Sequence, residues 1–253
     1  MQAGIKKFNL RFLLHKPKKT VQTTSMKKNL VRMAFCIVLS AVMVFFYQRH
    51  LTQDKPAFAL AQAQKTIYLT FDDGPSDSTT PFILDVLKEE RVPATFFIIG
   101  RQAKRRKNLI RRIQDEGHSI GIHSYSHIYS EIYRSPEALQ EDIQKCSDVL
   151  EGILGYKPQL YRFPGGSFCV RDELKECVKA LGYSYVDWNA SCRDAELINA
   201  SVEELVQSAI STSADRQTIV MLFHDSAHKN NTVWALKEII RYYKDAGYAF
   251  EKL

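Results

Sequence analysis

An alternation of short apolar segments with longer amphipathic ones, which begins at Lys65, constrains the fold of this chain more than any other feature. Apolar, β-branched or aromatic segments predict strands at residues 66–71, 94–100, 118–123, 161–163, 183–188, 218–223 and 248–250. Helices between them are indicated by an N-cap and proline at Thr80-Pro81, by a basic segment ending near Gly117, and by Ser135-Pro136 before a segment reaching Leu154. Strand–helix units of this length predict an α/β fold, either a barrel or an open sheet.

The size and charge of the chain fit one folded domain behind a basic N-terminal segment. With 253 residues, 45% of them hydrophobic, the chain can form one sizeable core. Residues 1–56 hold eleven Lys and Arg against the single Asp54, whereas the remaining residues hold 24 basic against 27 acidic ones. Because the basic excess belongs to the N-terminus, the domain at residues 65–253 gives no indication of a nucleic-acid partner.

The N-terminus has the pattern of an export device. A basic tail at residues 1–32 precedes an apolar run from Met33 to Tyr47, and a linker at residues 48–64 follows. A run of fifteen residues, interrupted only by Ser40, suits a signal peptide, with small residues for cleavage at 57–61, but flanking residues extend the run toward the roughly 20 that span a membrane. The basic tail predicts that residues 65–253 face outward. We expect a membrane-anchored domain, with secretion after cleavage as the alternative and Met26 as an alternative start.

The cysteines leave two possibilities open. Cys36 lies in the apolar run, which leaves Cys146, Cys169, Cys177 and Cys192 in the main domain. Four cysteines outside the cell can form two disulfides in three pairings, or they can remain small buried thiols.

Polar side chains gather where the predicted strands end. They are Asp72 and Asp73, His123, Arg162, Asp187 and His224. In a barrel of parallel strands, the carboxyl ends form the face on which catalytic groups meet. The same placement on five strands indicates a site at this face.

One pair of histidines has the spacing of a metal site. His123 and His127 lie four residues apart, a spacing that on a helical turn puts both imidazoles on one face. With one carboxylate from Asp72 or Asp73, they make a His₂-carboxylate set with an open position, which is typical of catalytic zinc. Because neighbouring strand residues point to opposite faces, we expect one aspartate to bind the metal and the other to accept a proton from water. Two unrelated surface histidines are the alternative.

Three more residues are candidates for acid–base work. His224 can act as a general acid or base, Asp187 can orient and charge it, and Arg162 can hold a catalytic carboxylate. The structural alternatives are a loop histidine, a capping aspartate and a surface ion pair.

Together these motifs resemble the polysaccharide deacetylases, which are carbohydrate esterase family 4 with its NodB homology domain. The motifs are T-F-D-D-G at residues 70–74, H-S-x-x-H at 123–127, R-F-P-x-G at 162–166, D-W at 187–188 and L-x-H at 222–224. They occur in the order and rough spacing of that family, and the resemblance covers residues 66–253. It implies a distorted (β/α) barrel of fewer than eight strands, preceded here by the membrane segment.

The resemblance also implies a role for each matching residue. Asp72 is the general base, positioned by Arg162, and His224 is the general acid, tuned by Asp187. Asp73, His123 and His127 hold a divalent metal ion, usually zinc, with cobalt or another divalent ion as an alternative. Trp188 and Leu222 wall the pocket for the acetyl methyl group, and Pro164 and Gly165 border the substrate.

Two departures from the family pattern stand out. Gly165 occupies a place that often carries an aromatic residue, although its N–H remains available to an oxyanion, and Ser184 replaces an aspartate. The expected activity is removal of N-acetyl groups from a cell-wall polysaccharide, with peptidoglycan N-acetylglucosamine leading and chitin oligomers, muramic acid or xylan as alternatives. A non-catalytic wall-binding module is the alternative from another class. The sequence gives no oligomeric state.

Overall fold

The computed structural model describes residues 22–53, 64–197 and 199–253. The expected basic tail up to residue 21, the small-residue cleavage sites and the linker at 54–63 lie outside these residues. The chain divides into two compact units, Met1–Gln62 and Ala63–Leu253. Each unit is described by itself.

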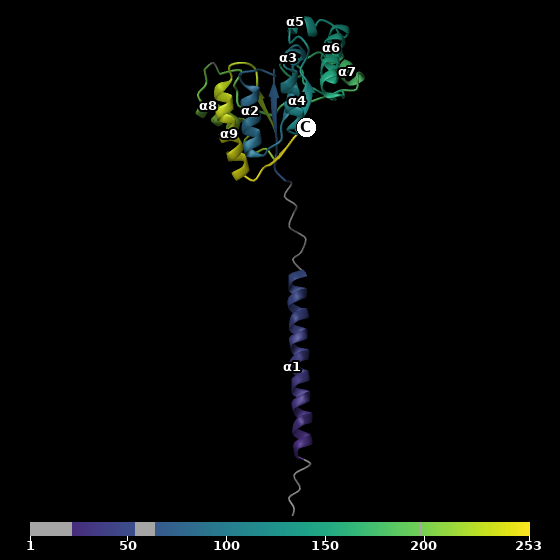
Figure 1. The fold of residues 1–253 in the computed structure, drawn as a ribbon, viewed down its shortest axis with the longest axis vertical. Helices are drawn as coiled ribbons and strands as arrows, with labels where there is room; N and C mark the ends of the chain where they lie inside the picture. Colours follow the sequence, from purple (N-terminus) through teal and green to yellow (C-terminus); the bar gives the residue numbers. More distant parts are fainter. Residues whose placement is uncertain (1–21, 54–63, 198) are drawn as a thin grey trace, which may run out of the picture. The chain divides into compact units, whose positions relative to one another are not determined.

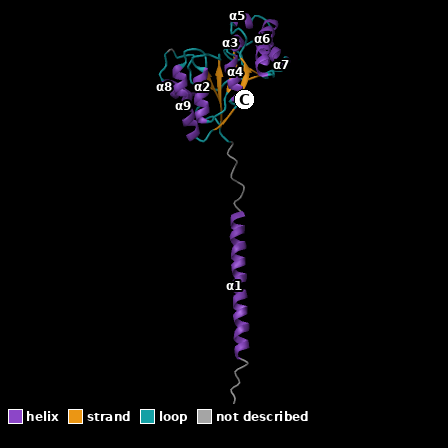
Figure 2. Ribbon diagram, viewed as in Figure 1, coloured by secondary structure: helices purple, strands orange, loops and turns teal. Residues whose placement is uncertain are grey.

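Parallel strands form the centre of the second unit (Figures 1 and 2). The strands are β1 (Thr66–Asp72), β2 (Thr95–Ile98), β3 (Ser119–Ile122), β4 (Leu160–Tyr161), β5 (Ser184–Tyr185), β6 (Ala190–Ser191), β7 (Thr218–His224) and β8 (Ala249–Glu251). Seven of them follow one path in the order β5-β4-β3-β2-β1-β7-β6, and β8 pairs beside the first half of β1. The predicted α/β fold is confirmed: the seven-strand path is a partial barrel, and β8 is a short addition to it.

Helices pack around these strands. They are α2 (Thr80–Glu90), α3 (Gly100–Arg105), α4 (Lys107–Asp115), α5 (Tyr129–Ile132), α6 (Pro136–Leu154), α7 (Asp172–Ala180), α8 (Val202–Thr212) and α9 (Asn230–Asp245). Neighbouring helices touch in the order α8-α9-α2-α4-α6-α7 (Figure 1). Their apolar faces and the strands enclose one core, in which the Phe71 ring stacks between Phe96 and Phe223.

Helix starts follow the sequence signals with one exception. Ser135 caps α6 as expected, because its side chain accepts the N–H of Ala138. In α2, however, Thr79 is the N-cap, so the predicted cap at Thr80 was wrong by one residue. The Thr80 hydroxyl is engaged elsewhere, since it accepts the N–H of Ser76 and donates to a buried carboxylate of Asp225. The basic segment forms two helices, because the chain leaves helical geometry at Arg106.

The described part of the first unit, residues 22–53, is the helix α1 (Gln22–Gln53). Its segment Lys28–Tyr47 is long and apolar enough to cross a membrane, and its side chains are exposed. By length and composition the segment suits a signal peptide as well as an anchor. The helix continues to Gln53, beyond the end of the apolar run.

Among the described residues all five cysteines are free thiols. Cys146 and Cys192 are buried, Cys177 is half-buried, and Cys36 and Cys169 are exposed. Of the two possibilities that the sequence leaves open, the structure therefore has thiols.

Candidate metal centre and active site

The ladder between β1 and β7 places the first aspartate opposite the last histidine. The two strands pair over seven residues, from Thr66 with Thr218 to Asp72 with His224. Partner residues in a parallel ladder lie about 4.8 Å apart and point to the same face of the sheet. The ladder is closed by the Asp225 N–H, which donates to the Asp72 carbonyl oxygen. Asp72 and His224 are therefore held side by side by backbone pairing.

Asp73 leaves the strand immediately. Its φ of 76° is in the left-handed region, which an aspartate adopts more readily than most residues. Strand alternation therefore does not separate the two carboxylates, contrary to our expectation. Both approach the same imidazole, since His123 Nε2 lies 3.9 Å from Asp72 Oδ2 and 3.5 Å from Asp73 Oδ1. The two aspartates differ instead in their other partners.

The two histidines lie on a loop rather than on the helical turn that their spacing suggests. His127 has a left-handed φ of 54°, and Ser124 has one of 71°. The Ser124 hydroxyl accepts the N–H groups of Ser126 and His127. From α6, the buried Asp142 carboxylate accepts the N–H groups of Ser126 and of the residue before it. These bonds turn the loop so that the two imidazole centres lie 5.1 Å apart.

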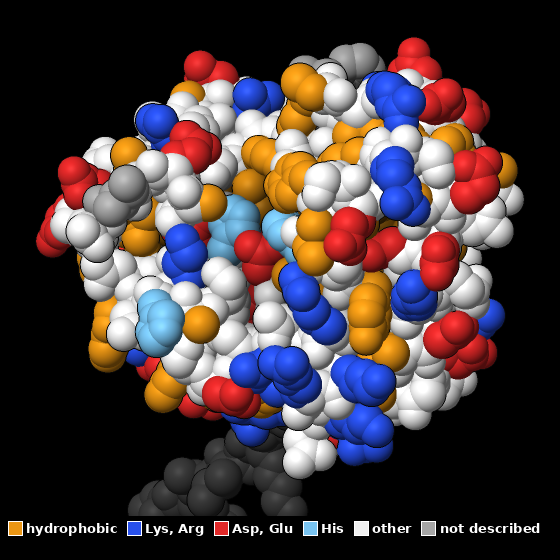
Figure 3. Space-filling view, turned by 90° about the horizontal axis from the view of Figure 1, so that it is seen from above, with side chains coloured by type: hydrophobic (Ala, Val, Ile, Leu, Met, Phe, Trp, Pro, Cys, Tyr) orange, Lys and Arg blue, Asp and Glu red, His pale blue; other side chains and the backbone are white. Residues whose placement is uncertain are grey.

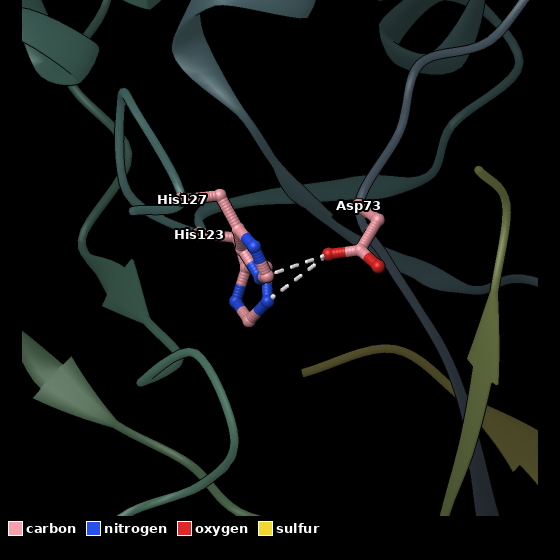
Figure 4. A group of neighbouring side chains, drawn as sticks. All are labelled: Asp73, His123 and His127. Carbon is pink, nitrogen blue, oxygen red and sulfur yellow. Dashed lines mark ion pairs between the residues drawn. The ribbon is translucent and has the colours of Figure 1, made fainter. Parts of the chain in front are cut away.

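Asp73, His123 and His127 fit a metal ion (Figure 4). Asp73 Oδ1 lies 3.2 Å from His127 Nε2 and 3.5 Å from His123 Nε2. Two ligands of tetrahedral zinc at about 2.0–2.1 Å are separated by about 3.3 Å, which is close to both distances. Asp73 Oδ1 is buried and has no hydrogen-bond partner among the described residues, so it is an acceptor that a cation would satisfy. His123 Nδ1 lies 2.9 Å from the Arg162 carbonyl oxygen, an orientation that presents Nε2 to the metal position.

The titratable groups of this cluster shift one another's pKa values. Burial opposes ionisation of Asp73, but the nearby imidazole of His123 prevails and lowers the pKa of the carboxyl. For His123, the carboxylates of Asp72 and Asp73 outweigh burial and raise its pKa. Burial and the neighbouring His123 lower the pKa of His127. Protons and a metal ion therefore compete for the same imidazole nitrogens.

Arg162 is fully buried and holds Asp72 in place. Its Nη1 donates to Asp72 Oδ1 at 3.0 Å and to the Thr70 hydroxyl at 2.7 Å, and its Nε donates to the Val186 carbonyl oxygen. The guanidinium carbon lies 4.1 Å from the centre of the Phe97 ring. A guanidinium fixed on this many sides gives the carboxylate one orientation. The contact expected from the sequence is present.

Asp194, not Asp187, is the partner of His224. Its Oδ1 lies 2.7 Å from His224 Nδ1, and its Oδ2 accepts the His224 backbone N–H. Burial acts to lower the pKa of His224, but the hydrogen bond and charge of Asp194 raise it to about 9. The same contact lowers the pKa of Asp194 against its own burial. His224 is therefore an imidazolium at neutral pH.

The expected pairing of Asp187 with His224 was wrong. The Asp187 carboxylate instead accepts the backbone N–H and the hydroxyl of Ser167, and thereby closes the loop that follows β4. Asp194 follows β6, a two-residue strand without a propensity signal of its own. The residues before it, Asn189 to Arg193, are mostly polar or small, so they give no apolar segment that would have indicated the site.

Asp225 is a second residue that the sequence analysis missed. It is fully buried behind Gly74, where an added Cβ would lie 2.0 Å from Asp225 Oδ2. Oδ2 accepts the Thr80 hydroxyl, and Oδ1 has no partner among the described residues. Burial, reinforced by the charges of Asp73 and Asp72, raises the pKa of Asp225 to about 7. The turn after the two aspartates thus packs directly on this carboxyl.

The residues expected to border the substrate lie at the same face. Trp188 is half-buried, 5.8 Å from the Arg162 guanidinium carbon, and Leu222 is buried two residues before the end of β7. The Pro164 carbonyl oxygen accepts the Tyr133 hydroxyl. Gly165 has a left-handed φ of 79°, and within the described parts of the chain we find no acceptor for its N–H. Their roles toward a substrate stay predictions.

Seen from above, the site is a hollow with histidines and acidic side chains at its floor (Figure 3). Hydrophobic side chains border the hollow on one side. The His224 imidazolium and the Asp72 carboxylate, which Arg162 holds, thus lie beside the three candidate metal ligands. Such a set can activate water and protonate a leaving group.

Comparison with known proteins gives consistent relatives. A family model described as "Polysaccharide deacetylase" matches residues 59–186. A putative polysaccharide deacetylase of Bacillus subtilis, YheN, is 35% identical over 193 residues, which are 74% of this chain and 66% of that protein. A peptidoglycan-N-acetylglucosamine deacetylase of Bacillus cereus is 34% identical over 74% of this chain and 85% of its own length. Among solved structures, a Streptococcus mutans CE4 esterase has a TM-score of 0.71 at 35% identity and covers 75% of this chain and 86% of that one.

Proposed function

Because this chain belongs to the polysaccharide deacetylase family, we propose that it removes the acetyl groups of N-acetylglucosamine in peptidoglycan in a metal-dependent reaction. Members of the family are hydrolases that act on the amide bonds of acetylated sugars. The observation that carries the proposal is the Asp73–His123–His127 cluster beside the paired Asp72 and His224. Peptidoglycan is the substrate named for the Bacillus cereus relative, and this supports it as the leading substrate here.

Asp72 is the proton acceptor in this proposal. Its Oδ1 is fixed by Arg162, whereas Oδ2 faces His123 at 3.9 Å and lies at the metal cluster. A water molecule between Oδ2 and the acetyl carbonyl carbon would lose its proton to Asp72 as it attacks. A base held in one orientation avoids the cost of finding the reactive geometry in each turnover.

His224 is the proton donor. Asp194 keeps its imidazole protonated at neutral pH and fixes the ring through Nδ1, so Nε2 is the nitrogen that remains to donate a proton. Because the ladder holds His224 opposite Asp72, the donor lies next to the base. Nε2 can then protonate the amine that leaves when the amide bond breaks. The N–H of Gly165 is available to stabilise the oxyanion.

Asp73, His123 and His127 are the residues that would hold the metal ion. When bound, a divalent ion at such a site acts as a Lewis acid and lowers the pKa of water. Two imidazoles and one carboxylate with an open position favour zinc, and cobalt or another divalent ion can take the same ligands.

We further propose that the catalytic domain works outside the cell on a membrane anchor. The basic tail, the apolar segment Lys28–Tyr47 and a cell-wall substrate support this location. The alternative is secretion after cleavage, which the N-terminal residue of the mature protein would reveal.

The test is acetate release by the full-length chain in detergent with zinc. Purified peptidoglycan, chitin oligomers, glycan strands whose N-acetylmuramic acid units carry no peptide, and acetylated xylan are offered in parallel, with mass spectrometry of the products. We expect acetate from peptidoglycan, with the acetyl group lost from glucosamine, and no release by Asp72→Asn. If acetate is released only from another polymer, that polymer replaces peptidoglycan as the proposed substrate. Equal values for the wild type and Asp72→Asn on all four would favour the non-catalytic wall-binding module.

A further inference from the structure

Two exposed aromatic rings lie at the rim of the hollow and take no part in the chemistry described above. Tyr129 is 49% exposed and Phe168 is 65% exposed. Tyr129 begins α5, directly after the metal-ligand loop, and Phe168 lies on the loop between β4 and α7. Large exposed apolar surface beside a polar cavity is typical of a ligand-binding groove.

The Tyr129 ring lies against the candidate metal ligands. Its centre is 5.5 Å from the His127 ring in an edge-on arrangement. Its hydroxyl reaches the next loop, where a Cβ added at Gly165 would lie 3.0 Å from the Tyr129 oxygen. A side chain at Gly165 would push against this ring, so a glycine at this position makes room for Tyr129.

The Phe168 ring lies on the other side of the two glycines. It packs edge-on against Trp188, with ring centres 5.5 Å apart. A Cβ at Gly166 would lie 2.8 Å from the Phe168 ring and 3.0 Å from Trp188, and Gly166 has a left-handed φ of 81°. Gly166 therefore lets the Phe168 ring fold back over the loop backbone.

These contacts join into one strip that borders the reacting groups. It runs from the ligand His127 through Tyr129, past the two glycines, to Phe168 and Trp188. Trp188 in turn lies near Arg162, which holds the base. One end of the strip thus touches the candidate metal ligand His127, and the other lies near the Arg162 guanidinium, which orients Asp72.

We propose that Tyr129 and Phe168 form a platform for the sugar rings that flank the acetylated sugar in a glycan chain. This inference rests on the proposed function, because it assigns the polymer-binding part of the same site. The two faces of a pyranose ring present C–H groups, which pack on the electron-rich face of an aromatic ring, while the hydroxyls stay at the rim in water. The side chains of Tyr129 and Phe168 have exposed area that such a ring can cover, and their edge-on neighbours hold them in position.

The platform predicts that affinity depends on the length of the glycan. A single acetylated sugar reaches only the reacting groups, whereas an oligomer also covers the rim. Loss of one stacking ring should weaken oligomer binding roughly tenfold and leave the monomer unchanged.

The experiment measures equilibrium binding, so that it does not depend on turnover. The full-length Asp72→Asn chain in detergent with zinc is titrated calorimetrically with N-acetylglucosamine and with its tetramer. In this background, Phe168→Ala and Tyr129→Ala should each raise the tetramer Kd roughly tenfold, and Phe168→Trp should retain tight binding. Tyr156→Ala is the matched control, because Tyr156 is an aromatic that is 43% exposed before β4, at the opposite end of the strands from the site.

The result distinguishes the platform from the proposed function. Tetramer binding equal to monomer binding in the parent, or tetramer affinity unchanged by both alanine variants, would overturn the platform even if the wild type releases acetate. Equal losses for monomer and tetramer would also overturn it, because the rings would then act on the reacting sugar. A wild type that binds the tetramer through these rings but releases no acetate would overturn the proposed activity and support the platform. Thermal unfolding of each variant checks that the fold is intact.

Discussion

Replacing Asp194 by asparagine should disable the acid at neutral pH without removing it. The substitution keeps the shape of the side chain and an oxygen that can accept the His224 backbone N–H, but it removes the charge 2.7 Å from Nδ1. With Asp194 present, the pKa of His224 is about 9; without it, burial, the largest influence, is opposed only by the smaller effects of the Asp72 and Asp73 charges. In Asp194→Asn the basic limb of the pH–rate profile should therefore move down by about two units or more.

The size of the effect follows from these values. At about pH 7.5 the protonated fraction of His224 should fall from nearly complete to roughly a quarter or less, so kcat should fall at least about fourfold. Toward pH 6 the difference should shrink, because the imidazole regains its proton. The raised pKa also means that protonated His224 stabilises the folded state fully at about pH 6.5, and that this contribution is lost as the pH rises through about 9; at acid pH it is lost as the Asp194 carboxylate protonates. For a side chain that is only 15% exposed, this contribution is about 3 kcal/mol.

The assay is acetate release against pH for the wild type, Asp194→Asn and Asp187→Asn, with the melting temperature measured over the same range. Asp187→Asn is the matched control, since its carboxylate contacts Ser167 and not His224. Its basic limb should stay in place. A shift of that limb in Asp187→Asn, with none in Asp194→Asn, would refute the assignment of Asp194 and restore the partner expected from the sequence.

Other substitutions test the remaining parts of the site. Asp73→Asn should lose zinc and recover partly in excess zinc or cobalt, whereas Asp72→Asn should bind zinc normally and stay inactive; elemental analysis that finds equal zinc loss would contradict this division. Asp142→Asn should weaken zinc binding about 10–100-fold by loosening the ligand loop, and a competition titration with unchanged affinity would argue against that support. Asp225→Asn should raise the melting temperature near pH 8 but not near pH 4. The reason is that a carboxyl with a folded pKa of about 7 destabilises the folded state as the pH rises from 3.8. A melting temperature at pH 8 below that of the wild type would contradict this prediction. If Met33–Tyr47 directs export, protease added to intact cells should degrade the domain, and full protection would exclude this topology.

The sequence alone was enough to find most of the reacting groups. Asp72, His123, Arg162 and His224 follow or end short apolar segments, and the carboxyl ends of parallel strands meet at one face. Local pattern and topology together therefore predict the face and most of its members. The bond of Arg162 to Asp72 joins residues 90 positions apart, and it was expected from the family resemblance.

The parts that the sequence could not supply depend on long-range pairing or on single backbone angles. β6 has two residues, and its pairing with β7 rather than its own propensity brings Asp194 to His224. The left-handed turn at Asp73 joins two carboxylates that strand alternation would part. Likewise, the i, i+4 spacing correctly paired His123 with His127, but a loop held from outside creates their geometry. Such features arise from tertiary contacts, which no local period encodes.

The unequal lengths of the strands have a consequence for how this site can move. Asp72 and His224 close a ladder of seven residue pairs between β1 and β7, whereas Phe168 and Trp188 of the aromatic rim lie on loops that follow β4 and β5, each two residues long. Local opening costs least where backbone pairing is shortest, so amide hydrogens around the rim should exchange with solvent long before those of β1 and β7. The spacing of base and acid then survives fluctuations that reshape the rim. Because the rim is held by short strands, substitutions there can change which glycans bind without changing the geometry of Asp72 and His224.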